Sequence, residues 1–228
     1  MTAIVKVCGN RSGGELIAAA RAGADLVGII FANARRRVAV EDARRMVEEL
    51  RAEVPNPPQV VGVFVDQPEE EVNRTADFVG LDFVQLHGKE GPDYWTRMER
   101  PLIIARRIST EIGLEAAEHE LAPAEAYAEK MGYLCLVEPH VEGAPGGAGV
   151  QMKSDLAQGL AARFPFLLAG GLTPETVADV IRTVRPWGVD VSSGVETNGV
   201  KDLAKVGRFV HEARRAGQTV NQVRFKMS

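Results

Sequence analysis

Proton-transfer groups stand at the ends of three short apolar runs in this chain. Cys8 follows the first run, His87 ends a later one and Glu138 ends another. A thiol, an imidazole and a carboxyl group are side chains that proteins use to remove and donate protons. Gln85 lies two residues before His87, and Asp190 lies in the last apolar run. If the fold brings these positions together, they form an acid/base set.

Arginines supply positive charge near the same positions. Arg35, Arg36 and Arg37 follow the second apolar run, and Arg106 and Arg107 follow the fifth. Guanidinium groups suit carboxylate and phosphate ligands, which indicates an anionic substrate. A solvated surface run is the alternative interpretation of such a cluster. The clustered His and carboxylate ligands of a metal site are missing from these positions, so we expect no metal.

Glycine-rich turns lie in the last third of the chain. Glycine lets backbone N–H groups approach an oxyanion closely, so such turns can bind a phosphate. The candidate positions are Gly147, Gly149, Gly170, Gly171, Ser192, Ser193 and Gly194. The alternative interpretation is that such glycines only allow the chain to turn, and for a single glycine pair this is the simpler one. Two such turns after the last two strands favour phosphate, because barrels of alternating strands and helices commonly hold one there.

The elements that position these residues alternate strictly along the chain. Each apolar run precedes a helical pattern, and continuous apolar runs are typical of parallel strands covered on both faces. The predicted strands are residues 3–9, 25–31, 59–65, 82–87, 102–106, 132–138, 164–170 and 187–193. Such alternation leaves a closed barrel or an open doubly wound sheet. The even spacing of the strands, without a division into halves, favours the barrel.

We therefore predict an α/β fold, a single (β/α)₈ TIM barrel over residues 1–217 with a C-terminal tail over 218–228. Its active site is expected at the C-terminal face of the barrel, where strands end and loops begin. Segment 108–131 is helical by composition but is the weakest part of the pattern.

Composition narrows the possible partners and location. The net charge of −4 argues against a nucleic-acid partner, which usually selects a basic surface. The two cysteines, Cys8 and Cys135, have no metal-ligand or disulfide spacing, as is typical of a reducing compartment. No apolar run approaches the roughly 18 residues of a membrane span. We expect a cytoplasmic protein without a membrane partner.

Seven short segments occur in order between residues 6 and 202: KVCG (6–9), GADLVGIIF (23–31), VVGVFVD (60–66), VQLHGKE (84–90), LLAGGLTPETV (167–177), GVDVSSGVE (188–196) and GVKD (199–202). Together they resemble the phosphoribosylanthranilate isomerase family. The resemblance implies a (β/α)₈ barrel that performs an Amadori rearrangement in tryptophan biosynthesis. It also implies a phosphoribosyl small-molecule substrate and neither metal nor organic cofactor.

The resemblance assigns roles in that reaction. A general acid protonates the ribose ring oxygen, and the ring opens to a Schiff base. A general base then removes the C2′ proton to give an enolamine, which becomes the ketone. Cys8 matches the family's base, and Glu138 stands at the position of the acid. Without the resemblance, a lone cysteine at a strand end is more simply a small buried apolar residue.

Glu138 departs from the family, which has aspartate at this position. Its carboxyl group is one methylene further from the backbone, and a displacement near 1 Å can cost on the order of 10²-fold in rate. Either the pocket is rebuilt around Glu138 or the substrate differs. A solvated loop carboxylate is the third interpretation.

Other substrate contacts follow from the same comparison. Arg37 is predicted to bind the substrate carboxylate, and Asp190 to lie near the aromatic end of the site. Gln85 and His87 are predicted to line the pocket, with structural hydrogen bonding as an equal alternative. No role is assigned to Arg11, Arg35 or Arg36.

Three functions are compatible with these residues. The first is an aldose–ketose isomerase acting on N-(phosphoribosyl)anthranilate. The second is a divergent isomerase of the same fold acting on a related phosphoribosyl amine. The third is a non-catalytic phosphosugar-binding protein, against which the retained Cys8 argues. Monomer and homodimer are both expected possibilities.

Overall fold

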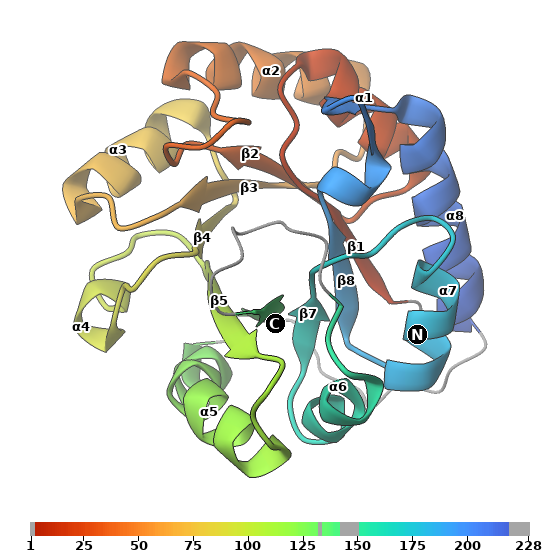
Figure 1. The fold of residues 1–228 in the computed structure, drawn as a ribbon. Coiled ribbons are helices and arrows are strands. Elements are labelled where there is room, and N and C mark those ends of the chain that lie inside the picture. Colours follow the sequence, from red (N-terminus) through yellow and green to blue (C-terminus); the bar gives the residue numbers. More distant parts are fainter. Residues whose placement is uncertain (1–2, 132–133, 142–150, 219–228) are drawn as a thin grey trace.

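Eight parallel strands close into a barrel surrounded by helices in the computed structural model, which describes residues 3–131, 134–141 and 151–218 (Figure 1). The strands neighbour one another in sequence order, and β8 returns to pair with β1. They are β1 (Ile4–Val7), β2 (Leu26–Ile30), β3 (Gln59–Phe64), β4 (Phe83–Leu86), β5 (Leu102–Ser109), β6 (Leu134–His140), β7 (Phe166–Leu168) and β8 (Gly188–Val191). The predicted (β/α)₈ barrel is confirmed.

Helices follow the strands and cover the outside of the barrel (Figure 1). They are α1 (Gly13–Ala22), α2 (Val40–Glu53), α3 (Glu69–Val79), α4 (Pro92–Trp95), α5 (Leu114–Met131), α6 (Ser154–Ala161), α7 (Val177–Val184) and α8 (Leu203–Gln218). After β8 the chain forms the short 3₁₀ turn η1 (Ser193–Val195) and a hairpin of β9 (Glu196–Thr197) and β10 (Val200–Lys201) before α8 begins. The predicted tail starts at the last residue of α8, and 219–228 lie outside the described residues. None of the helices in the described ranges has the length and apolar character of a membrane span.

Strand side chains alternate between the barrel interior and the layer beneath the helices. Leucine, valine, isoleucine and phenylalanine side chains fill the interior, including Leu26, Val61, Phe83, Ile103, Leu136 and Leu167. Nearer the carboxyl ends of the strands lies a smaller buried cluster of Cys8, Ile30, Ala32 and Val63. Because these side chains are few and mostly small, this end of the barrel has room for a pocket.

An ion pair inside the barrel joins the first and last strands. Parallel pairing of β1 with β8 places Lys6 opposite Asp190, and Lys6 Nζ lies 2.9 Å from Asp190 Oδ1. Lys6 is fully buried. Burial alone would lower the pKa of Lys6, but the neighbouring Asp190 carboxylate raises it above its ordinary value. Lys6 is therefore a buried cation paired with a buried anion.

The strands β5 and β6 extend beyond their predicted ends. They pair in register from Ile103 with Leu134 to Ser109 with His140, whereas the predictions ended at 106 and 138. The last residues of both strands are largely polar, so the apolar pattern did not reveal them. As a result Glu138 lies within β6. Of the uncertain segment 108–131, residues 114–131 form α5, which contains Pro123.

We predict that Lys6→Met lowers the free energy of unfolding by about 3–5 kcal/mol, because it leaves the Asp190 carboxylate buried without its cation. Urea denaturation of the purified protein measures this loss. Lys89→Met, which changes an exposed lysine, serves as the control and should stay within about 0.5 kcal/mol of the parent protein. A Lys6→Met protein as stable as the parent would contradict the assigned role of the pair.

Candidate active site

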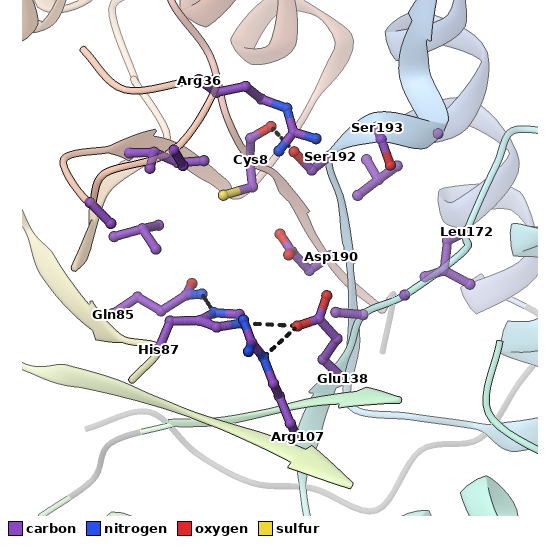
Figure 2. A pocket seen from close by; sticks show the side chains of 18 of the residues that line it. Cys8, Arg36, Gln85, His87, Arg107, Glu138, Leu172, Asp190, Ser192 and Ser193 are labelled. Carbon is purple, nitrogen blue, oxygen red and sulfur yellow. Dashed lines mark hydrogen bonds and ion pairs between the residues drawn. The ribbon is translucent and has the colours of Figure 1, made fainter. Parts of the chain in front are cut away.

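A pocket of about 210 Å³ opens at the carboxyl ends of the strands (Figure 2). It brings together most of the residues predicted from the sequence. Its lining includes Cys8, Gln85, His87, Glu138, Gly170, Gly171, Asp190, Ser192, Ser193 and Gly194. The predicted positions Gly147 and Gly149 lie outside the described residues.

Cys8 is held on one wall of this pocket by the seam between β1 and β8. Its backbone N–H donates to the carbonyl of Val191 at 2.8 Å, and Ser192 Oγ donates to the Cys8 carbonyl at 3.1 Å. A Cβ atom at Gly28 would lie 2.7 Å from the Cys8 sulfur, so only glycine there leaves room for the thiol. The thiol side chain therefore has a defined place beside the cavity.

Glu138 lies across the pocket from Cys8 and is bound by a chain of side chains (Figure 2). Gln85 Nε2 lies 2.9 Å from His87 Nδ1, and His87 Nε2 lies 2.9 Å from Glu138 Oε2. With the amide nitrogen of Gln85 facing the ring, Nδ1 accepts a hydrogen bond and the ring proton is on Nε2. The Nε2–H group of His87 then donates a hydrogen bond to Glu138. This is the tautomer that orients the carboxylate.

Arg107 strengthens this arrangement because its Nε lies 3.5 Å from the same Glu138 oxygen. Burial alone would raise the pKa of Glu138, but the hydrogen bond from His87 and the charge of Arg107 lower it below its ordinary value. Figure 2 shows the second oxygen of Glu138 turned away from both partners. One oxygen is thus held by the protein, and the other is available to a ligand.

Asp190 shows the same division between its two carboxylate oxygens. Oδ1 accepts from Lys6, while Oδ2 accepts from no donor among the described residues. Because Asp190 lines the pocket, its second oxygen can accept a hydrogen bond from a bound hydroxyl or amine.

The structure corrects the arginine that faces the pocket. Arg36 lines it, whereas Arg37 is exposed and lines a separate shallow hollow beside α1 and α2. A turn closed by the hydrogen bond from the Arg37 N–H to the Ala34 carbonyl, at 3.0 Å, sends the two neighbouring side chains to different sides. Three consecutive arginines carry no local signal of that turn. Arg36, and not the predicted Arg37, is therefore the arginine of this run that lines the pocket.

Two glycine turns meet at the edge of the pocket. Gly170 and Gly171 have φ values of 93° and 62°, in the left-handed region that favours glycine. A Cβ atom at Gly194 would lie 1.8 Å from the carbonyl oxygen of Leu172, so the turns after β7 and β8 pack directly on one another. The backbone N–H groups of Gly171 and Leu172 donate to no described residue. They are available to an anion at this edge.

Comparison with known proteins decides the family. Residues 5–212 match the family described as N-(5'phosphoribosyl)anthranilate (PRA) isomerase. The chain belongs to this isomerase family. A relative from Roseiflexus sp. (strain RS-1), named N-(5'-phosphoribosyl)anthranilate isomerase, is 42% identical over 224 residues, which cover 94% of this chain and 99% of the relative. The family resemblance and the predicted class of enzyme are confirmed.

Solved members of the isomerase family share the fold. Phosphoribosyl anthranilate isomerase from Thermotoga maritima superposes with a TM-score of 0.79 and 32% sequence identity, covering 93% of this chain and 99% of the other. A further isomerase structure, in complex with reduced 1-(o-carboxyphenylamino)-1-deoxyribulose 5-phosphate, has a TM-score of 0.76 and 31% identity, with the same coverage.

We predict that His87→Phe raises the pKa of Glu138, because the variant keeps a ring of similar size but loses the donor that stabilises the carboxylate. A ¹³C NMR titration of the Glu138 carboxyl group measures the change. His119→Phe, at an exposed histidine, is the control and leaves that pKa unchanged. Since the folded-state pKa of Glu138 lies below its usual 4.5, the stability contributed by the pair is present above that pH. It is lost as the pH falls through the folded-state value. An unchanged Glu138 titration in His87→Phe would rule out this account.

Proposed function

We propose that this protein converts N-(5'-phosphoribosyl)anthranilate to the corresponding aminoketose in tryptophan biosynthesis, with Cys8 as general base and Glu138 as general acid. The observation that carries the proposal is that one pocket holds both groups, Cys8 directly after β1 and Glu138 on β6, with the free amides of the glycine turns at its edge. The family match and the relatives' names support the same reaction.

The pocket suggests an orientation for the substrate. Its phosphate binds the backbone amides near Gly171 and Gly194, and its aromatic carboxylate binds the guanidinium of Arg36. The ribose then spans the space between Cys8 and Glu138. Asp190 Oδ2 accepts a hydrogen bond from the sugar or from the anilino nitrogen.

Ring opening uses the carboxyl group of Glu138. Glu138 first takes up a proton from solvent and then donates it to the ribose ring oxygen, the C1′–O bond breaks, and the nitrogen lone pair forms the C=N bond. Glu138 is left as a carboxylate, which His87 and Arg107 stabilise. Because these two residues favour the anion, they make Glu138 a stronger acid at the moment the proton leaves.

The second step uses Cys8 as a thiolate. It takes the C2′ proton, and the electrons of that C–H bond form the C1′–C2′ double bond of the enolamine as the C=N electrons return to nitrogen. Protonation at C1′ and loss of the C2′ hydroxyl proton complete the ketone. No net oxidation occurs, so the reaction consumes no redox partner.

Two further expectations remain predictions for this chain. One related structure is described as monomers generated from a dimeric isomerase from Thermotoga maritima, and light scattering in solution would distinguish monomer from homodimer here. Cytoplasmic location stays an expectation from the cysteine content.

We predict that Cys8→Ser and Glu138→Gln each lower kcat by on the order of 10² to 10⁴, the range for removing one acid or base. Turnover is followed directly, because the fluorescence of the substrate falls on rearrangement. Cys135→Ala, at a buried cysteine outside the pocket lining, is the control and retains activity.

Glu138→Asp tests whether the pocket is built around the longer acid. The shorter side chain withdraws the carboxyl group from His87 and the substrate, and we expect a loss on the order of 10²-fold. A faster Glu138→Asp enzyme would contradict this arrangement. The parent protein could also bind reduced 1-(o-carboxyphenylamino)-1-deoxyribulose 5-phosphate without converting N-(5'-phosphoribosyl)anthranilate. That result would instead favour a substrate that is a related phosphoribosyl amine, or a protein that only binds phosphosugars.

We predict that Gly194→Ala raises KM roughly tenfold with little change in kcat, because the new methyl group forces the two glycine turns apart where the phosphate binds. Steady-state kinetics gives KM, and inhibition by inorganic phosphate gives the affinity for phosphate itself. We expect substrate binding and phosphate inhibition to weaken in parallel. Gly207→Ala is the matched control, since a Cβ atom there meets no atom within 4 Å. Equal KM values for the two variants would contradict a phosphate site at this edge of the pocket.

A further inference from the structure

Glu196 is a buried carboxylate beside the pocket that the proposed chemistry does not use. It begins β9, and its side chain is 6% exposed. Arg36 Nε lies 2.7 Å from one carboxylate oxygen and Arg35 Nη2 lies 2.7 Å from the other. Lys201 Nζ, on β10, lies 3.7 Å from the oxygen shared with Arg36. One carboxylate thus contacts three cations.

This cluster holds more positive than negative charge. Burial alone would raise the pKa of Glu196, but the hydrogen bond from Arg35 and the charges of Arg36 and Lys201 lower it, so Glu196 is an anion. Three cations around one anion leave a positive excess beside the cavity. An anionic ligand group is the natural complement of that excess.

Arg36 is fixed at two points along its side chain. Gly9 has a φ of 74°, and a Cβ atom there would lie 2.8 Å from Arg36 Cδ, so the aliphatic part of Arg36 packs directly on this glycine. Glu196 then binds Nε. The two Nη groups of Arg36 donate to no described residue, and Figure 2 shows the guanidinium beside Ser192 at the cavity.

The hairpin that carries Glu196 is itself tied to the loops after β1 and β2. The carbonyl of Gly199 accepts from Arg35 Nη1 at 2.8 Å and from Arg11 Nη2 at 3.1 Å. Lys201 Nζ donates to the carbonyl of Ser192 at 2.8 Å. Glu196 is therefore held in place independently of Arg36, as a positioning group must be.

We propose that Glu196 is a positioning residue that selects substrates bearing an aromatic carboxylate. By binding Nε of Arg36, it turns the two Nη groups toward the cavity, where they meet the two oxygens of that carboxylate. This inference rests on the proposed function, because it takes the carboxylate of the anthranilate ring as the ligand of Arg36.

The test compares two ligands by calorimetry. One is reduced 1-(o-carboxyphenylamino)-1-deoxyribulose 5-phosphate, and the other is the same compound without the ring carboxylate. The ratio of their affinities measures carboxylate selection alone. In Glu196→Asp, which keeps the charge but withdraws from Nε, we expect this ratio to fall on the order of tenfold, the loss of one hydrogen bond to a charged group. The affinity for the ligand without the carboxylate stays unchanged.

Glu196→Gln separates positioning from simple charge neutralisation. Removing a negative charge near Arg36 would strengthen carboxylate binding if Glu196 only neutralised the cluster, so the ratio would rise. Positioning predicts that the ratio falls. A ratio that rises or stays constant in either variant overturns the proposal, as does an equal loss for both ligands.

Two further variants complete the design. Arg35→Gln removes the more exposed partner of Glu196 and leaves the ratio within about twofold of the parent. Arg36→Met abolishes selection, and adding Glu196→Asp to it causes no further loss, because the two residues act as one unit. A parent protein that fails to distinguish the ligands would refute the Arg36 contact of the proposed function. Selection by the parent that survives in Glu196→Asp would refute the positioning role alone.

Discussion

Closure of the barrel by pairing of β1 with β8 is the constraint on which the site depends. Lys6 and Asp190 are 184 positions apart in the chain, and so are Cys8 and Ser192, yet each pair is in direct contact. The pairing of β1 with β8 orients the Cys8 thiol through backbone hydrogen bonds. It also orients one oxygen of Asp190 through the buried ammonium group of Lys6. The cost of burying two charges is offset only because they face one another. Without closure, the thiol of Cys8, the proposed base, would have no fixed position in the pocket.

The proposed acid, Glu138, lies in a different part of the barrel. Glu138 lies within β6, His87 directly follows β4 and Arg107 lies within β5, so three neighbouring strands define the place of one carboxylate. The proposed base and the proposed acid are therefore supported by separate sets of contacts. The glycine turns after β7 and β8 and the Arg36 loop after β2 lie between them around the rim. A ligand that contacts all of these regions is oriented by several rigid elements at once.

Much of this architecture follows from the sequence alone. Apolar runs predict each of the eight strands, and barrel topology then predicts that residues at strand ends such as Cys8 and His87 share a face. The remaining details depend on contacts between distant segments. Arg36 and Arg37 are identical in type and adjacent, and only the turn at Ala34 decides which faces the cavity. Glu196 belongs to a recognisable motif, but its two arginine partners lie about 160 positions away.

The role of Gly194 and the ends of β5 and β6 also depend on contacts between distant segments, which the local sequence does not reveal. Nothing local marks Gly194 as irreplaceable, because the obstacle is the carbonyl of Leu172 in another turn. The polar ends of β5 and β6 gave no apolar pattern, since those residues pair beyond the packed interior.

The long ladder between β5 and β6 has a consequence for how the barrel opens. Seven residue pairs are in register there, whereas two are in register between β7 and β8. Local opening requires less free energy where backbone pairing is shorter, so amide protons should exchange with solvent sooner along the β7–β8 seam than along the β5–β6 ladder. That seam leads into the glycine turns, while the ladder carries Glu138 and Arg107. Transient fluctuations can thus widen the edge of the pocket at the glycine turns while the Glu138 carboxyl group keeps its orientation.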